Sequence, residues 1–321
     1  MSASPWDDAG VARREGRYRE VEARYLATES IEPEERRVEL ASTRTSVRVL
    51  SVGDGAPVLF VHGASTSGAG WAPLAARLTG HRRLLLDRPG CGLSDPLDEP
   101  RHEMTTFEPF ADALVADVLD ALAIDRADVV ATSLGAYFAL RAAAAHPDRI
   151  GRLVLVAFPI GARVTHTPWS MRMTAVPGLG RLMTRLPVGE RMARSMLRQL
   201  GLGPALDTGQ LPPEGIAWFR SVINDTGTMR HEIDAMPPLV HPRHGLSPEL
   251  VLDDELLARI TAPTLFLWGT ADPIGGADVA RAFAPKIAGA RLDLLPDAGH
   301  VPWLDAPDAV AAEVDAFLRR G

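Results

Sequence analysis

The sequence of 321 residues contains little cysteine and no excess of positive charge. Cys91 is its only cysteine, so the chain can form neither an internal disulfide nor a thiolate metal site from that residue alone. Lys and Arg total 34 against 41 Asp and Glu, which gives a net charge of −7. Because no basic stretch is present to neutralise phosphates, we expect no nucleic-acid partner.

The sequence also lacks the long apolar runs of membrane proteins. Its first ten residues contain two aspartates and no apolar core, unlike a secretory signal. The uncharged stretch 55–76 is long enough to span a bilayer, but it contains several glycines, two prolines and His62. A lipid-facing helix would instead be mostly Leu, Ile, Val and Phe. We therefore expect a cytoplasmic protein with no membrane partner.

Hydrophobic residues make up 46% of the chain and charged residues 23%, the balance of a folded protein with a sizeable core. Short apolar runs alternate with helical patterns, which predicts an α/β fold with a mostly parallel sheet flanked by helices. The predicted strands are 47–52, 58–61, 83–86, 128–132, 153–158, 264–268 and 292–295. The predicted helices are 107–122, 134–145, 278–283 and 306–318.

Residues 159–258 interrupt this alternation. They contain helical pieces separated by Pro and Gly and seven of the nine methionines, which predicts an inserted, mainly helical cap. The α/β core would then comprise 36–158 and 259–321. Residues 1–35 are charged and helix-prone, so we expect an N-terminal helical extension that packs loosely on the core or serves as a partner-binding arm.

The sharpest chemical signal is Ser133 in the segment Val-Val-Ala-Thr-Ser-Leu-Gly-Ala, between a predicted strand and a predicted helix. A serine on such a tight turn is exposed, and small residues two before and two after it allow the strand and helix to approach closely. This is the pattern of a nucleophile elbow, with Ala131 in place of the usual first glycine. Taken alone, the segment is equally compatible with an ordinary helix N-cap serine.

A serine nucleophile needs a base, and the base needs an orienting acid. Asp272 follows the predicted strand 264–268, and His300 follows the predicted strand 292–295. Both would therefore lie at the carboxyl edge of the sheet beside Ser133. The chain order Ser, Asp, His is the order found in α/β hydrolases.

On these residues the sequence resembles the α/β-hydrolase superfamily over 40–158 and 259–320. The segments 60–64 (Phe-Val-His-Gly-Ala) and 87–95 (Asp-Arg-Pro-Gly-Cys-Gly-Leu-Ser-Asp) resemble two further family motifs. The resemblance implies a Ser133–His300–Asp272 triad that works through an acyl-enzyme, with no metal or organic cofactor. It also implies an oxyanion hole formed by the backbone N–H groups of Ala64 and Leu134.

Several other polar residues are interpreted as structural. We expect His62 to hydrogen-bond within its loop, Asp87 and Arg88 to hold their turn together, and Cys91 to be buried. Asp297 precedes the base within its turn, so Asp272 is favoured as the acid. The remaining histidines of interest lie in the cap and are weak evidence for a metal site: His231, His241 and His244.

The cap carries the candidate substrate-binding residues Trp169, Trp218 and Phe219, which could line an apolar pocket or form the core of the cap itself. We expect a small, apolar carbonyl substrate, a carboxylic ester first. Hydrolysis of a carbon–carbon bond in a diketone is the alternative, and basic residues facing the serine would favour it. The candidates for that role are Arg163, Arg172 and Arg191.

The sequence is also compatible with three other functions of the same fold: acyl transfer, perhydrolysis and a non-catalytic ligand-binding role. The sequence also leaves open whether the chain is a monomer or a homodimer.

Overall fold

A computed structural model of the chain describes residues 8–99, 103–164, 167, 169–176, 178–235 and 239–320. Its centre is an eight-stranded sheet of order β1-β2-β4-β3-β5-β6-β9-β10. The strands are β1 (Glu34–Leu40), β2 (Thr45–Val52), β3 (Ala56–Val61), β4 (His81–Leu86), β5 (Ala127–Thr132), β6 (Ile150–Pro159), β9 (Thr264–Gly269) and β10 (Arg291–Leu295). Strand β2 is antiparallel to both of its neighbours, and from β4 to β10 every pairing is parallel. The predicted fold class is confirmed.

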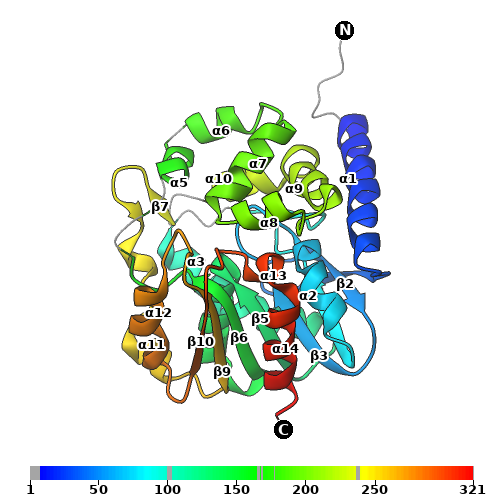
Figure 1. The fold of residues 1–321 in the computed structure, drawn as a ribbon. Helices are drawn as coiled ribbons and strands as arrows, with labels where there is room; N and C mark the ends of the chain where they lie inside the picture. Colours follow the sequence, from blue (N-terminus) through cyan, green and yellow to red (C-terminus); the bar gives the residue numbers. More distant parts are fainter. Residues whose placement is uncertain are drawn as a thin grey trace.

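Helices cover both faces of the sheet (Figure 1). The helices of the core are α2 (Ala72–Arg77), α3 (Met104–Ala121), α4 (Ser133–Ala145), α11 (Asp254–Ala258), α12 (Ala277–Phe283), α13 (Pro302–Asp305) and α14 (Pro307–Leu318). Alternation along each strand divides the apolar side chains between two cores. Leu59 and Val61 of β3 join the core that includes α3 and α4, whereas Val58 and Phe60 join the core that includes α2 and α14.

The described part of the chain between β6 and Leu246 lies above the carboxyl edge of the sheet (Figure 1). Its elements are α5 (Trp169–Thr174), α6 (Leu179–Met183), α7 (Glu190–Gln199), α8 (Gly203–Thr208), α9 (Pro213–Asp225), α10 (Thr228–Asp234) and the hairpin β7 (Val240–His241) and β8 (Gly245–Leu246). We call this segment the cap. Buried side chains of α7, α8 and α9 continue the core of α2 and α14 upward, so apolar packing joins the cap to the sheet.

The N-terminal helix α1 (Asp8–Thr28) stands beside both the cap and the sheet (Figure 1). The side chains of Tyr18 and Tyr25 are completely buried, and Glu22 between them is 5% exposed. The helix is therefore packed much more closely than its charged composition predicts. The reason is that its buried face is partly polar, with charged groups that are paired inside the protein rather than solvated.

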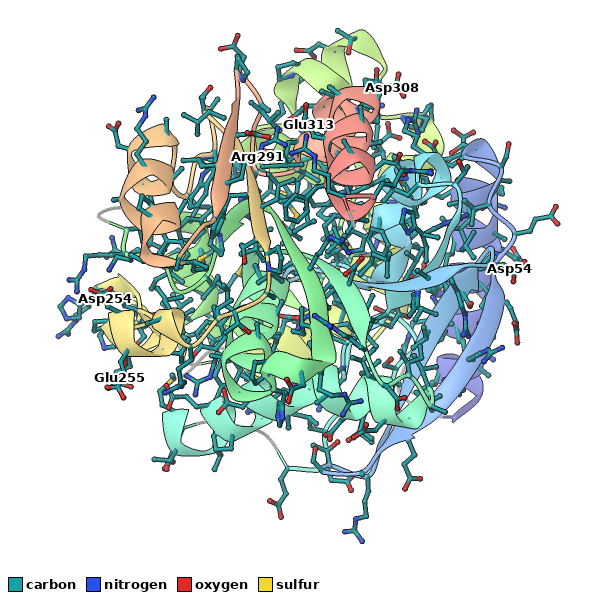
Figure 2. The ribbon with its side chains drawn as sticks, turned by 90° about the horizontal axis from the view of Figure 1, so that it is seen from below. Asp54, Asp254, Glu255, Arg291, Asp308 and Glu313 are labelled. Atoms are coloured by element: carbon teal, nitrogen blue, oxygen red, sulfur yellow. The ribbon has the colours of Figure 1, made fainter. Side chains whose placement is uncertain are left out.

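The edge of the sheet opposite the cap carries charged side chains. Viewed from below, Asp54, Asp254 and Asp308 lie at the periphery of the molecule (Figure 2). Arg291 of β10 pairs with Glu313 of α14 at 2.6 Å, which ties the edge strand to the final helix. No helix among the described residues is both long enough and apolar enough to cross a bilayer.

Candidate active site

Three parallel strands deliver the predicted catalytic side chains to one edge of the sheet. Ser133 follows β5, Asp272 follows β9 and His300 follows β10, while β6 lies between β5 and β9. The carboxyl ends of parallel strands meet at the same edge, where ligands bind in open α/β sheets. The expected placement of the three residues at this edge is therefore observed.

Ser133 occupies the tight turn from β5 into α4. Its φ is +51°, in the left-handed region that costs a non-glycine residue free energy. A Cβ added to Gly135 would lie 2.2 Å from the Val61 carbonyl oxygen, and one added to Gly63 would lie 3.0 Å from Ser133 Cβ. The small residues around the serine are thus required because α4 and the loop after β3 crowd against each other. Ser133 is 8% exposed, so the residue is buried and not exposed as the turn predicts.

Asp272 and His300 are in direct contact. His300 Nδ1 lies 2.7 Å from Asp272 Oδ2. Asp272 also accepts hydrogen bonds from the backbone N–H of Phe158 at 3.1 Å and of Ile274 at 2.9 Å. Burial acts to raise the pKa of Asp272, but His300 and the two N–H groups outweigh it and lower that pKa below its usual value. The carboxylate is held ionised and in a fixed orientation toward the imidazole.

The end of β6 connects the serine to the acid. The N–H of Phe158 donates to Asp272, and the N–H of Ile160 donates to the Ser133 carbonyl oxygen at 3.1 Å. Ala157, one residue earlier, has a φ of +74°, so the strand is kinked where it presents these groups. A single strand end therefore fixes the backbone of Ser133 relative to the carboxylate of Asp272.

Asp297, the other carboxylate near the base, is exposed and has a φ of +58°. Its backbone N–H donates to Thr270 Oγ1 at 2.9 Å. Asp272, and not Asp297, is therefore the carboxylate that contacts the imidazole of His300.

The predicted oxyanion donors lie on the two sides of Ser133. Leu134 is in the first turn of α4, where N–H groups have no acceptor within the helix and the helix dipole is positive. Ala64 is in the loop after β3, directly beyond Gly63, which abuts Ser133. Their use as donors stays a prediction.

His62 is structural, as expected. Its Nε2 accepts the backbone N–H of Arg88 at 3.0 Å, so its Nδ1 carries the proton and donates to the Gly63 carbonyl oxygen at 2.7 Å. Burial, with the nearby Arg88 guanidinium, lowers the pKa of His62 well below its usual value. The ring is therefore neutral and holds the start of the loop after β3.

Arg88 does more than hold its own turn. Its guanidinium donates to the carbonyl oxygens of His62 and Gly63 at 3.0 and 2.9 Å and pairs with Glu232 of the cap at 2.6 Å. Cys91 is fully buried, as expected, and its thiol donates to the same carboxylate at 3.1 Å. Glu232 was not identified from the sequence because no local pattern marks a cap carboxylate that pairs with a residue 144 positions away.

A second cap contact reaches the histidine loop. The N–H of His300 donates to the Leu200 carbonyl oxygen at 2.9 Å. A Cβ on Gly201 would lie 2.7 Å from Gly299 Cα, so two glycines allow the cap and the histidine loop to approach. The cap therefore bears directly on the position of the imidazole.

The structure describes the side chains of two of the three candidate substrate-binding residues. Trp218 stacks on Tyr25 of α1 with ring centroids 5.0 Å apart, and Phe219 belongs to the same apolar cluster. Both side chains are therefore buried in the apolar core that the cap shares with α1 and the sheet. The side chain of Trp169 lies outside the described part of the chain.

The basic candidates of the cap point to other partners or to solvent. Arg172 donates to the carbonyl oxygens of Pro242 and Arg243, whereas Arg163 and Arg191 are exposed. His241 and His244 stack on each other with ring centroids 4.8 Å apart. Among the described residues, no group of three or more His, Cys, Asp or Glu side chains could hold a metal ion.

Comparisons with known proteins agree with this architecture. The model of the Alpha/beta hydrolase family matches residues 58–313. The chain is 26% identical over 282 residues to the 2-hydroxy-6-oxononadienedioate/2-hydroxy-6-oxononatrienedioate hydrolase of Klebsiella pneumoniae, covering 85% of this chain and 91% of the relative.

Two solved structures illustrate the shared fold. The 2-hydroxy-6-oxo-6-phenylhexa-2,4-dienoate hydrolase from Rhodococcus is 20% identical with a TM-score of 0.74, covering 90% of this chain and 100% of its own. Carboxylesterase CesB from Bacillus subtilis is 21% identical with a TM-score of 0.72, covering 96% and 99%. Since the family model spans most of the chain, this protein belongs to the alpha/beta hydrolase family.

Proposed function

We propose that this protein is a serine hydrolase that cleaves small apolar carboxylic esters. The observation that carries the proposal is the 2.7 Å contact between Asp272 and His300 at the sheet edge that also holds the strained Ser133. An oriented base and a serine on a strained turn, brought to one sheet edge, are the groups that a hydroxyl nucleophile needs for attack on a carbonyl.

The reaction proceeds in two halves. Ser133 Oγ attacks the ester carbonyl while His300 Nε2 takes the serine proton, and the tetrahedral intermediate then expels the alcohol, which receives that proton. Water attacks the acyl-serine with His300 again as base, and the carboxylic acid leaves. Asp272 accepts a hydrogen bond from Nδ1–H throughout, which leaves Nε2 free to take the serine proton and stabilises the imidazolium.

The negative charge on the carbonyl oxygen needs donors that are already in place. The N–H groups of Ala64 and Leu134 supply them in this proposal. Such a preorganised donor is worth roughly 10²–10³ in rate in other enzymes.

The cap favours an ester over a substrate with a free carboxylate. Arg172 already donates to two backbone carbonyl oxygens, and Arg88 is paired with Glu232. The second candidate, hydrolysis of a carbon–carbon bond in a dienoate, is favoured by the named activity of the 26% identical Klebsiella relative. Both reactions would use Ser133, His300 and Asp272.

The direct test offers both substrate classes to the same preparation. We expect p-nitrophenyl acetate and butyrate to be hydrolysed with kcat/KM at least tenfold above that for 2-hydroxy-6-oxo-6-phenylhexa-2,4-dienoate. Ser133→Ala should abolish turnover, whereas Ser195→Ala at an exposed serine of α7 should leave it unchanged. Faster cleavage of the dienoate would replace the ester proposal with the second candidate. Tight ligand binding without turnover of either class would instead favour a binding protein.

A further inference from the structure

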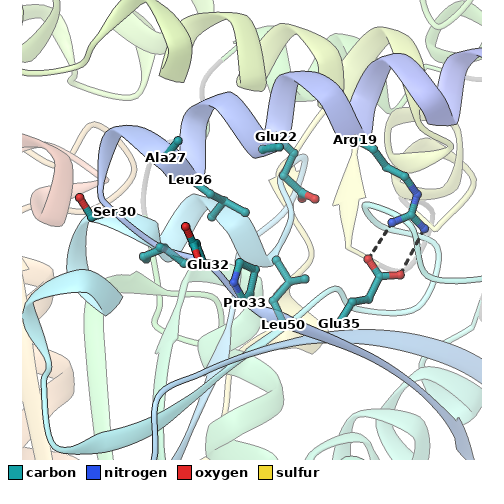
Figure 3. A pocket seen from close by; sticks show the side chains of 11 residues that line it. Arg19, Glu22, Leu26, Ala27, Ser30, Glu32, Pro33, Glu35 and Leu50 are labelled. Atoms are coloured by element: carbon teal, nitrogen blue, oxygen red, sulfur yellow. Dashed lines mark hydrogen bonds and ion pairs between the residues drawn. The ribbon is translucent and has the colours of Figure 1, made fainter.

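Helix α1 lies outside the part of the chain that the family model matches, which begins at residue 58. It nevertheless buries two tyrosines completely. Over part of its length it does not pack flush on the sheet, because a cavity of about 620 Å³ separates it from β1 and β2. Figure 3 shows Arg19 and Glu35 bridging one end of this cavity, with Glu22 and Leu50 among the residues that line it. Polar contacts, and not apolar packing alone, therefore hold α1 against β1 and β2.

A closed ring of hydrogen bonds joins α1 to the end of the loop after β3. Its members, in order, are Ser67, Tyr18, Glu22, Arg48, Asp87 and Gly68. Ser67 and Gly68 are adjacent in the sequence, so the peptide bond between them closes the ring. The hydrogen bonds of Ser67 Oγ and of the Gly68 N–H therefore fix the backbone at the end of the loop.

The first half of the ring comes from α1. Tyr18 Oη lies 2.7 Å from Glu22 Oε1 and 2.8 Å from Ser67 Oγ. Burial, reinforced by the charge of Glu22, raises the pKa of Tyr18, so the phenol keeps its proton and donates a hydrogen bond to Glu22. The Ser67 hydroxyl is consequently the donor to the Tyr18 oxygen.

The second half comes from the sheet. Both terminal nitrogens of Arg48 donate to Glu22, at 2.9 and 2.5 Å, and its Nε donates to Asp87 Oδ2 at 2.8 Å. Asp87 Oδ1 then accepts the N–H of Gly68 at 2.7 Å. The side chains of Arg48 and Asp87 are fully buried, so these charged hydrogen bonds are shielded from solvent and from salt.

The loop between His62 and Ser67 needs support at both ends. Ser65 within it has a φ of +59°, which is unfavourable for a non-glycine residue and persists only when the surroundings enforce it. His62 and Arg88 hold the first end, and the ring holds the second. Ala64, the proposed oxyanion donor, lies between the two anchors.

Helix α1 also contacts the cap through its buried face and a neighbouring position. Tyr25 stacks on Trp218 of α9, and Arg17 pairs with Asp225 of α9 at 2.8 Å. Helix α1 therefore connects the cap with the loop that carries Ala64.

We propose that Tyr18 is a positioning residue, which acts through Ser67 to hold the Ala64 N–H where the oxyanion forms. This inference rests on the proposed function, because it assigns a role in the chemistry of that site. Removing the hydroxyl of Tyr18 lets the loop relax and weakens transition-state stabilisation, while substrate binding by the cap is unaffected.

The test uses three variants, Tyr18→Phe, Ser67→Ala and the double variant that combines these two substitutions. Each is compared with the control variant Tyr25→Phe. Tyr25 is a matched control, since it is buried in the same helix and its hydroxyl has no hydrogen-bond partner among the described residues. For p-nitrophenyl ester hydrolysis we expect kcat to fall about tenfold in either single variant and no further in the double variant. This is part of the roughly 10²–10³ that an entire donor is worth. KM should stay within about twofold, and Tyr25→Phe should match the wild type.

Amide hydrogen exchange separates this inference from the proposed function. Exchange over 62–68 should be faster in Tyr18→Phe than in Tyr25→Phe, whether or not the protein hydrolyses esters. A wild type without esterase activity would contradict the proposed function. Hydrogen exchange would still test whether Tyr18 holds the loop through Ser67. Unchanged exchange and unchanged kcat in Tyr18→Phe, or losses that multiply in the double variant, would overturn the positioning role.

Discussion

At the scale of single residues, backbone strain gathers around the predicted chemistry. Ser65, Ser133 and Ala157 all have positive φ angles, and each lies in a segment that presents a group to the site. Glycines occur beside them where another backbone passes too closely for a side chain, most tightly at Gly135. The local sequence around Ser133 is therefore constrained by both geometry and reactivity.

Gly135→Ala tests the close approach of α4 to β3. A Cβ there would lie 2.2 Å from the Val61 carbonyl oxygen, so the helix must move. We expect a loss of about 1–3 kcal/mol in the free energy of unfolding, as for overpacked cores, together with loss of esterase activity. Urea unfolding and an ester assay measure both. Unaltered stability and activity would show that the elbow tolerates a methyl group at this position.

The neutral, buried His62 makes stability depend on pH. Its pKa in the folded protein is well below the ordinary value of 6.5, so between these two values only the unfolded chain binds the proton. The free energy of unfolding should therefore decline as pH falls below 6.5, by at most about 1.4 kcal/mol per pH unit from this group. His231, whose pKa burial also lowers, adds to the same trend.

Urea unfolding between pH 7.5 and 5 measures this dependence. His62→Gln should be less stable than the wild type at pH 7.5 but should show a shallower decline with acid. Equal slopes in the two proteins would show that His62 is not the group responsible.

Sequence patterns identify the site residues whose chemistry is local and miss those that act at a distance. Ser133, Asp272 and His300 can be found because each sits at a strand end within a recognisable turn. Tyr18, Glu22 and Arg48 form one buried network. Tyr18 and Glu22 nevertheless lie in a segment whose composition resembles a solvated helix, and Arg48 is a lone charge within an apolar strand. No periodicity reveals that charges are buried when they are paired across different elements.

At the scale of elements, the buried parallel strands are readily predicted and the edges are not. Strands such as β6 are near-continuous apolar runs, as expected for strands covered on both faces. Strand β1 reads Glu-Glu-Arg-Arg-Val-Glu-Leu and was not predicted, because a partly exposed edge strand has no apolar run. The hairpin of β7 and β8 in the cap is too short to give a pattern.

Helix α1 offers a test of its own stability. Gly16 lies inside it and is exposed, and apart from the neighbouring backbone of the helix no heavy atom among the described residues lies within 4 Å of an added Cβ. Gly16→Ala should therefore raise the free energy of unfolding by roughly 0.5–1 kcal/mol through helix propensity alone. The same substitution destabilises at Gly135, so the pair forms an internal control. A destabilised Gly16→Ala protein would contradict the described packing of α1.

Across the molecule as a whole, two polar contacts between the cap and the core involve residues in or next to the candidate active site. Leu200 accepts from the N–H of His300, and Glu232 pairs with Arg88, whose guanidinium also holds the loop after β3. Cap, sheet and α1 are thus connected through the site itself. This connection implies that changes in the cap affect catalysis as well as specificity.

Glu232→Ala tests the fastening of the cap. It leaves the buried guanidinium of Arg88 without its carboxylate, and breaking a buried pair typically costs about 3–5 kcal/mol. Chemical denaturation should show a loss of that order. Asp207→Ala, which removes an exposed pair with Arg198, should leave the unfolding curve unchanged. Equal curves for Glu232→Ala and the wild type would show that the pair of Glu232 with Arg88 does not stabilise the folded protein.

We expect His300 and Asp272 to activate Ser133 as a nucleophile. The most direct measurement is covalent labelling with a fluorophosphonate, followed by mass spectrometry of the intact protein and its peptides. We predict one adduct, on Ser133, that is absent in Ser133→Ala and forms much more slowly in His300→Ala. A folded wild type that forms no adduct on Ser133, or labels equally fast without His300, would contradict the claim.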